Sequence, residues 1–382
     1  MLESFLKIIN GEKADEIVWT ADINYWIDSQ IARGLGQAKW HTEKGFLELC
    51  RELGIVPYFN YQYEKYNPFN SNFNEKVKYV EETADSKKWC AYSPPVDTSK
   101  PVRLRWITPV GEIYKLYVYC EASNSWAPHR FPIQNAEDMK VFLYLLENRR
   151  LEPANLDDYR QRMDLWAQYD GLPAIGMTQD PLAQMMHYWA GVENTAYFMA
   201  DNPSLVQQAY SLMEEQEGCV IDAICELAPP LVHILDNQHS GTMAGYFETY
   251  MAPRYGRIVE KFNKVGTRTV THIDGKIWPL LKMTADIGFH GCEALTPNPD
   301  EMSVQDIVRL VPRKDFILWG GIPAAMFSPG NTWNNMREHV QELLDSWSGH
   351  PFIVGVGDCV PADGQIEFVR KISDMVRGLT YN

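Results

Sequence analysis

Residues Thr267–Gly275 read TRTVTHIDG, and they decide where a strand ends and which side chains stand at its end. The β-rich run from Thr267 to Thr271 predicts a strand that Gly275 terminates. Because side chains alternate along a strand, His272 and Asp274 are expected on the same side at its carboxyl end, where they could bind a metal or move a proton. Taken alone, the pair fits an ordinary strand-to-helix turn better, with Asp274 capping a helix that starts near Lys276.

The same alternation of strand and helix continues beyond this stretch. The strand TRTVTHID is followed by a helix through Ile287, and three more pairs follow, with strands GCEALTP (291–297), DFILWGGIP (315–323) and FIVGVGD (352–358). Helices are expected through Leu310, over 334–347 and over 365–377. Four consecutive units with apolar strands predict a parallel sheet with helices outside it.

Four earlier stretches add strand candidates: IVWTA (17–21), GIVPYFNY (54–61), LPAIGMTQ (172–179) and LAPPLVHILDN (227–237). The total of about eight strands favours an α/β fold of the closed (β/α)8 TIM barrel type over an open sheet. We expect one domain over 1–382 with a decorated N-terminal region. The segment from Asn67 to Pro101 is polar and is interrupted by prolines, which predicts irregular structure. Apolar and polar residues alternate on either side of 109–111, which predicts a β-hairpin. We expect this hairpin and the irregular segment to be insertions into the barrel, within about 60–130.

The composition limits the classes of function. With 382 residues, 45% of them hydrophobic and 22% charged, the chain has ample material for a globular core. A formal net charge of −15 argues against nucleic-acid binding. No run approaches ~18 apolar residues, so no membrane span is expected. The N-terminus lacks the pattern of a signal peptide, and seven cysteines without a CxxC pair suggest reduced thiols. We therefore expect a cytoplasmic protein.

In a (β/α)8 barrel the functional residues stand at the carboxyl ends of the strands. The expected catalytic residues there are His272, Asp274 and Glu293. The expected metal ligands are His272, Asp274, Glu293, Asp358 and Cys359, a set that suits zinc. The expected substrate-binding residues are Trp19, Asp22, Asn237, His239 and Trp319. Plainer interpretations remain open for Glu293 as an exposed acid, Asp358 as a turn former and Cys359 as a buried filler. His233 lies in the apolar run LVHIL, and we expect it to be a core residue.

Six blocks of the chain resemble the uroporphyrinogen decarboxylase superfamily. They are ITPVG (107–111), FPIQNAEDMK (131–140), FETYMAPRYGRIVEKFNKVG (247–266), HIDG (272–275), EALTPNPD (293–300) and VGDCVPADGQIEFV (356–369). That superfamily contains a haem-pathway decarboxylase and zinc-dependent, corrinoid-linked methyltransferases. The resemblance covers most of the chain and implies a (β/α)8 barrel, in agreement with the strand count.

Two comparisons favour the methyltransferase branch. The decarboxylase branch carries an RQAGR signature that holds acidic substrate side chains, and this chain has none, with 50 acids against 35 bases. The methyltransferase branch uses a His-x-Cys pair and a later Cys as zinc ligands. Here the pair reads His272-x-Asp274, with a carboxylate in place of the thiolate, and the later position falls at or next to Cys359. Carboxylates are also acceptable zinc ligands.

The resemblance therefore implies a zinc-dependent methyltransferase. It would move a methyl group from a small methylated substrate, best a methoxylated aromatic in an O-demethylase system, to the cobalt of a separate corrinoid protein. Two alternatives stay open: a uroporphyrinogen decarboxylase-like lyase that works without metal, and a binding barrel that has lost catalysis. An acidic barrel of this size is also compatible with a homodimer.

Overall fold

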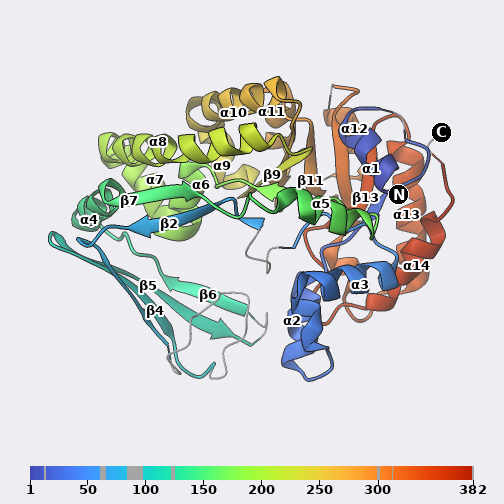
Figure 1. Ribbon diagram of the computed structural model, residues 1–382, viewed down its shortest axis with the longest axis horizontal. Coiled ribbons are helices and arrows are strands. Elements are labelled where there is room, and N and C mark those ends of the chain that lie inside the picture. Colours follow the sequence, from blue (N-terminus) through green and yellow to red (C-terminus); the bar gives the residue numbers. More distant parts are fainter. Residues whose placement is uncertain are drawn as a thin grey trace. The chain divides into compact units, whose positions relative to one another are not determined.

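The computed structural model describes residues 1–12, 14–60, 66–83, 98–121, 125–298, 302–311 and 313–380 (Figure 1). The chain forms two compact units. Unit 1 comprises Met1–Pro68, Asn155–Thr178 and Ile224–Asn382, and unit 2 comprises Phe69–Ala154 and Gln179–Ala223. Along the sequence, the long helix α8 (Pro203–Leu227) begins in unit 2 and ends in unit 1. Our expectation of a single domain stays a prediction.

Unit 1 is built on a curled sheet of parallel strands. Its seven strands follow the order β1-β13-β12-β11-β10-β9-β8. Their bounds are β1 (Trp19–Thr20), β8 (Ile175–Gly176), β9 (Leu231–Gln238), β10 (Arg268–Ile273), β11 (Gly291–Leu295), β12 (Ile317–Pro323) and β13 (Phe352–Gly357). Every described pairing in this sheet is parallel. The predicted α/β class with a parallel sheet is therefore confirmed.

The eighth expected strand, at GIVPYFNY, is not a regular strand among the described residues. Its backbone nevertheless hydrogen-bonds toward both edges of the sheet: the Val56 N–H donates to the Trp19 carbonyl (2.9 Å), and the Ala174 N–H donates to the Tyr58 carbonyl (3.0 Å). Pro57 has no N–H to offer a ladder, which accounts for the irregular pairing. Closure into a full eight-stranded barrel stays a prediction.

Helices connect the strands of unit 1. They are α1 (Leu2–Ile9), α2 (Asn24–Ala32), α3 (Glu43–Leu53), α5 (Tyr159–Ala167), α9 (Ser240–Tyr246), α10 (Ala252–Lys264), α11 (Leu280–Asp286), α12 (Val304–Leu310), α13 (Trp333–Trp347) and α14 (Ile366–Val376). The bounds of α13 and α14 agree with the prediction to within one residue. Most of these helices are amphipathic; α10, for example, buries Tyr255, Ile258, Val259 and Phe262. None of the described helices is long and apolar enough to cross a membrane.

Unit 2 contains two antiparallel sheets. The predicted hairpin forms as β4 (Val102–Thr108) and β5 (Gly111–Cys120), within the order β3-β4-β5-β6 that also includes β3 (Lys78–Glu82) and β6 (Ser125–Arg130). β2 (Phe69–Phe73) pairs with β7 (Arg149–Pro153). The expectation of irregular structure over 67–101 is thus wrong at β2 and β3, while residues 84–97 lie outside the described residues. Helices α4 (Ala136–Glu147), α6 (Pro181–Gln184) and α7 (Val192–Asp201) and the π-helix η3 (Met185–Trp189) complete the unit.

Candidate functional site

The site begins with a histidine and a glutamate on neighbouring strands. The parallel register pairs His272 at the end of β10 with Glu293 in β11. Because Glu293 and Cys292 alternate across the strand, Glu293 turns to the side that His272 occupies. The Nδ1 of His272 and the Oε2 of Glu293 are 2.6 Å apart, and both side chains are buried. Glu293, for which an exposed position was one interpretation, is only 3% exposed.

A second histidine reaches the same carboxylate oxygen from β9. The Nε2 of His233 lies 3.3 Å from the Oε2 of Glu293, and His233 is 1% exposed. Its other ring nitrogen, Nδ1, is buried and has no hydrogen-bond partner among the described residues. His233 is therefore buried, as predicted, but it belongs to a polar group and not simply to the apolar core.

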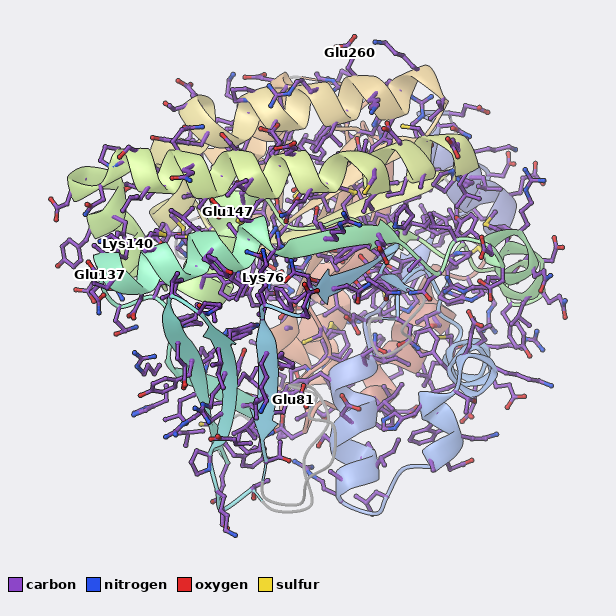
Figure 2. All side chains as sticks on the ribbon, turned by 60° about the vertical axis from the view of Figure 1, so that its left-hand side comes forward. Lys76, Glu81, Glu137, Lys140, Glu147 and Glu260 are labelled. Atoms are coloured by element: carbon purple, nitrogen blue, oxygen red, sulfur yellow. The ribbon has the colours of Figure 1, made fainter. Side chains whose placement is uncertain are left out.

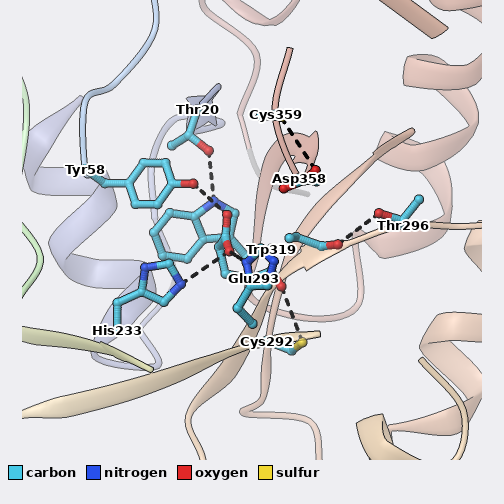
Figure 3. A network of polar contacts seen from close by, with 11 residues as sticks. Thr20, Tyr58, His233, Cys292, Glu293, Thr296, Trp319, Asp358 and Cys359 are labelled. Atoms are coloured by element: carbon cyan, nitrogen blue, oxygen red, sulfur yellow. Dashed lines mark hydrogen bonds and ion pairs between the residues drawn. The ribbon is translucent and has the colours of Figure 1, made fainter. Parts of the chain in front are cut away.

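Tyr58 binds the other oxygen of the Glu293 carboxylate. Its hydroxyl donates to the Oε1 of Glu293 at 2.6 Å (Figure 3). The Tyr58 ring packs on Trp319 with ring centroids 4.5 Å apart, and the Trp319 indole N–H donates to the Thr20 hydroxyl at 2.8 Å. Both oxygens of Glu293 are thus held by side chains from distant parts of the sequence.

The charges of this group follow from burial and proximity. Burial would raise the pKa of Glu293, but His272 and His233 together hold it well below its usual range. Burial also lowers the pKa of His272, yet the Glu293 charge and hydrogen bond outweigh it and raise that pKa to about 9. For His233, burial prevails and lowers the pKa. At neutral pH the group thus contains an anion, an imidazolium and a neutral imidazole.

His233, His272 and Glu293 form a set that could hold a metal ion. Each offers one ligand atom, and these atoms lie within 4.8 Å of one another. Two imidazoles and one carboxylate are a ligand set known for catalytic zinc, in which three protein ligands leave one coordination position open. Binding would displace the proton from His272, so metal affinity would depend on pH.

Three of the predicted ligands lie outside this three-residue group. Asp274 follows β10 and is exposed, and Asp358 follows β13, is exposed and has a φ of +92°. Cys359 is half-buried, and its thiol donates to the Oδ2 of Asp358 at 3.5 Å. Burial raises the pKa of Cys359 well above its ordinary value, which keeps the thiol protonated in the metal-free protein. Their roles as ligands stay predictions.

The predicted substrate-binding residues have varied surroundings. Trp19 and Trp319 are fully buried, while the Oδ1 of Asp22 accepts hydrogen bonds from the Asn24 backbone and side chain, both at 2.8 Å. Burial raises the pKa of Asp22 to about 7. Asn237 is exposed, and the His239 Nδ1 accepts from the Gly241 N–H at the start of α9. Their contact with a substrate stays a prediction.

Sequence reasoning missed two residues of the candidate site, His233 and Tyr58. The sheet register places His233 beside Val270, which lies on the same side of β10 as His272, so both imidazoles face one way. Strand parity in the sequence could not show this, because the register between β9 and β10 comes from the structure. Tyr58 had no such signal, because only the tertiary structure brings residue 58 to residue 293.

One family model and one solved structure agree with this architecture. The family model for uroporphyrinogen decarboxylase (URO-D) matches residues 145–379. A solved structure, a methyltransferase from Methanosarcina mazei, aligns with a TM-score of 0.57 over 97% of this chain and 97% of that chain at 14% identity, which shows a common fold. A D-psicose 3-epimerase crystallised with D-fructose aligns with 59% of this chain and 85% of its own at 9% identity, with a TM-score of 0.36. None of the curated proteins matches.

Proposed function

Because this chain belongs to the uroporphyrinogen decarboxylase family, we propose that it is an enzyme of the methyltransferase type whose active site is the group His233, His272 and Glu293. It would move a methyl group from a small methylated substrate, best a methoxylated aromatic, to the cobalt of a separate corrinoid protein. The observation that carries the proposal is the buried set of two imidazoles and one carboxylate on the neighbouring strands β9, β10 and β11. The fold similarity to the Methanosarcina mazei methyltransferase is consistent with it.

The residues fit a zinc ion. His233 has a buried ring nitrogen without a hydrogen-bond partner among the described residues, and Glu293 is an anion. An unpaired buried polar atom is costly, so a ligand that uses the neutral imidazole would remove that cost. His233, His272 and Glu293 would hold the ion, which when bound would polarise the oxygen or nitrogen that carries the methyl group.

The other side chains of the site would orient these ligands. The Tyr58 hydroxyl fixes one oxygen of Glu293 and leaves the other turned toward the two histidines. Hydrogen bonds of this kind set the orientation of a metal-binding carboxylate. Trp319, anchored by Thr20, packs against Tyr58 and keeps that ring in place. Asp22, with its raised pKa, would supply a proton to a leaving group at neutral pH.

A second arrangement of ligands uses the other nitrogen of His272. A histidine that donates Nδ1–H to a carboxylate commonly binds metal through Nε2. In that arrangement Glu293 would orient His272, and Asp274, Asp358 or Cys359 would complete the set, as the sequence resemblance implies. The first arrangement needs His233, whereas the second does not need His233 and can use Cys359.

Metal content measured by ICP mass spectrometry on protein purified without chelator tests both arrangements. About one zinc per chain is expected in the parent protein. Loss of zinc in His233→Ala and His272→Ala, with zinc kept in Cys359→Ser, supports the buried set. Loss in Cys359→Ser with zinc kept in His233→Ala replaces it with the second arrangement. No zinc in the parent protein, even after incubation with zinc, contradicts both and leaves a metal-free lyase or a binding barrel.

The methyl transfer itself is tested separately. The zinc-loaded protein is mixed with a cobalt(I) corrinoid acceptor and a panel of methoxyarenes and methylamines, and methyl-cobalt formation is followed by absorbance. His272→Ala is the matched inactive variant. Zinc binding without transfer to any acceptor would contradict the methyltransferase proposal while leaving the metal site intact.

A further inference from the structure

Unit 2 contains a lysine in a place where lysines are rarely found. Along β5 the buried face of the strand is formed by Ile113, Lys115 and Tyr117, and Lys115 is only 3% exposed. Lysine is almost never this buried unless an anion pairs with it. No carboxylate or other hydrogen-bond acceptor pairs with the Lys115 amine among the described residues.

Aromatic rings surround the amine in place of an anion. The Nζ of Lys115 lies 4.7 Å from the ring centroid of Tyr117, 5.1 Å from that of Tyr188 and 5.3 Å from that of Phe131. These rings come from β5, from the π-helix η3 and from the residue after β6, so three separate segments form the enclosure. Tyr188 is 42% exposed and forms its solvent side.

The enclosure stabilises the ammonium only in part. Cation–π contacts recover only part of the solvation free energy that an ammonium loses when it is buried. Burial accordingly lowers the pKa of Lys115 to about 7. A sizeable fraction of the amine is therefore neutral at neutral pH, and a neutral, desolvated lysine is a nucleophile.

We propose that Lys115 is a second reactive site of this protein, an amine that condenses with small aldehydes to form an imine. The nitrogen lone pair attacks the carbonyl carbon, proton transfer gives a carbinolamine, and loss of water leaves the C=N bond, so water is the only other product. The ring faces around Nζ offer no hydrogen-bond donors to an oxyanion, which disfavours acyl transfer. They also limit the access of water, which protects the imine from hydrolysis.

The test compares Lys115 with an exposed lysine of the same unit. Lys140 lies on the surface of α4 and pairs with Glu137 at 2.7 Å (Figure 2). The full chain is incubated at pH 7 with limiting acetaldehyde and cyanoborohydride, and the alkylated lysines are quantified by peptide mass spectrometry. Lys115 is expected to react about tenfold or more faster than Lys140 in the folded protein, because its lowered pKa leaves a sizeable fraction of the Lys115 amine neutral at pH 7. In denaturant the two should react alike.

Two variants complete the experiment. Lys115→Met should abolish the fast phase of labelling, and Lys140→Met should leave it unchanged. Lys115 reacting no faster than Lys140 in the folded protein would overturn the proposal and show that the lysine only packs against the rings. A fast phase that persists in Lys115→Met would overturn it as well.

Discussion

Replacing Tyr58 by Phe tests how the buried carboxylate is held. The substitution removes one hydroxyl, which donates to the Oε1 of Glu293 at 2.6 Å, and leaves the ring packing on Trp319 in place. A hydrogen bond to a charged group contributes about 1.5–3 kcal/mol, and a buried carboxylate that loses a donor pays its desolvation cost. We therefore expect the free energy of unfolding to fall by about 2 kcal/mol.

Tyr66 provides a matched control within the same core cluster. It is nearly as buried as Tyr58, at 6% against 4% exposed, but its hydroxyl has no hydrogen-bond partner among the described residues. Tyr66→Phe removes an unpaired polar group, so the free energy of unfolding should change by less than about 0.5 kcal/mol or increase.

Both variants are compared with the parent by urea unfolding at pH 7 after chelator treatment, followed by tryptophan fluorescence. A lower midpoint at an unchanged slope reports a loss of stability. Equal losses in the two variants would show that ring size and not the contact with Glu293 decides the effect. A loss below about 0.5 kcal/mol in Tyr58→Phe would refute the hydrogen-bond argument.

Three further changes test other parts of the fold. Thr20→Val removes the acceptor of the Trp319 indole N–H, and the unpaired buried donor should cost about 1–3 kcal/mol in urea unfolding; an unchanged midpoint would contradict the contact. Gly320→Ala places a Cβ 2.6 Å from the backbone of the neighbouring strand at a φ of +128°, so very little soluble protein is expected. Gly330 also has a positive φ, +97°, but open space around it, so Gly330→Ala should lower the free energy of unfolding by only about 1–2 kcal/mol. The pKa of Lys115 is lowered to about 7 in the folded protein, so between pH 7 and 10.5 the unfolded chain binds more protons than the folded one. The free energy of unfolding of the parent protein should therefore rise by on the order of 3 kcal/mol from pH 7 to pH 9.5. Lys115→Met should be more stable at pH 7 and should lack this rise; a parallel rise in both proteins would contradict the assignment.

The second half of unit 1 could be predicted from the sequence because its strands are apolar runs with sharp ends. The strands around Thr267–Gly275 and after it formed where expected, and the family inferred from the sequence blocks is confirmed. No regular strand forms over the described residues 54–60, because Pro57 has no N–H to complete a ladder of backbone hydrogen bonds. The strands β2 and β3 were missed because they are largely exposed and carry no apolar alternation to reveal them.

The contacts of the candidate site could be predicted only in part. His272 and Glu293 follow from strand ends and alternation, and the structure brings them into contact. His233 was assigned to the core because its neighbours are apolar, yet a buried strand interior is also where a polar group gains most from a partner. The contact of Tyr58 with Glu293 joins residues 235 positions apart, and no local pattern in the sequence encodes it.

The division of the chain has a consequence for its synthesis on the ribosome. All of unit 2 is translated by Ala223, whereas unit 1 still lacks the strands from β9 to β13 at that point. The first strand, β1, pairs with the last, β13, and Thr20 donates to the carbonyl of Val354. Because domains generally fold as units during synthesis, unit 2 is expected to fold first, before β13 is available to pair with β1. The segment that contains β1 therefore stays unpaired along that edge until β13 has been synthesised, and over that time the exposed edge needs protection from pairing with other chains.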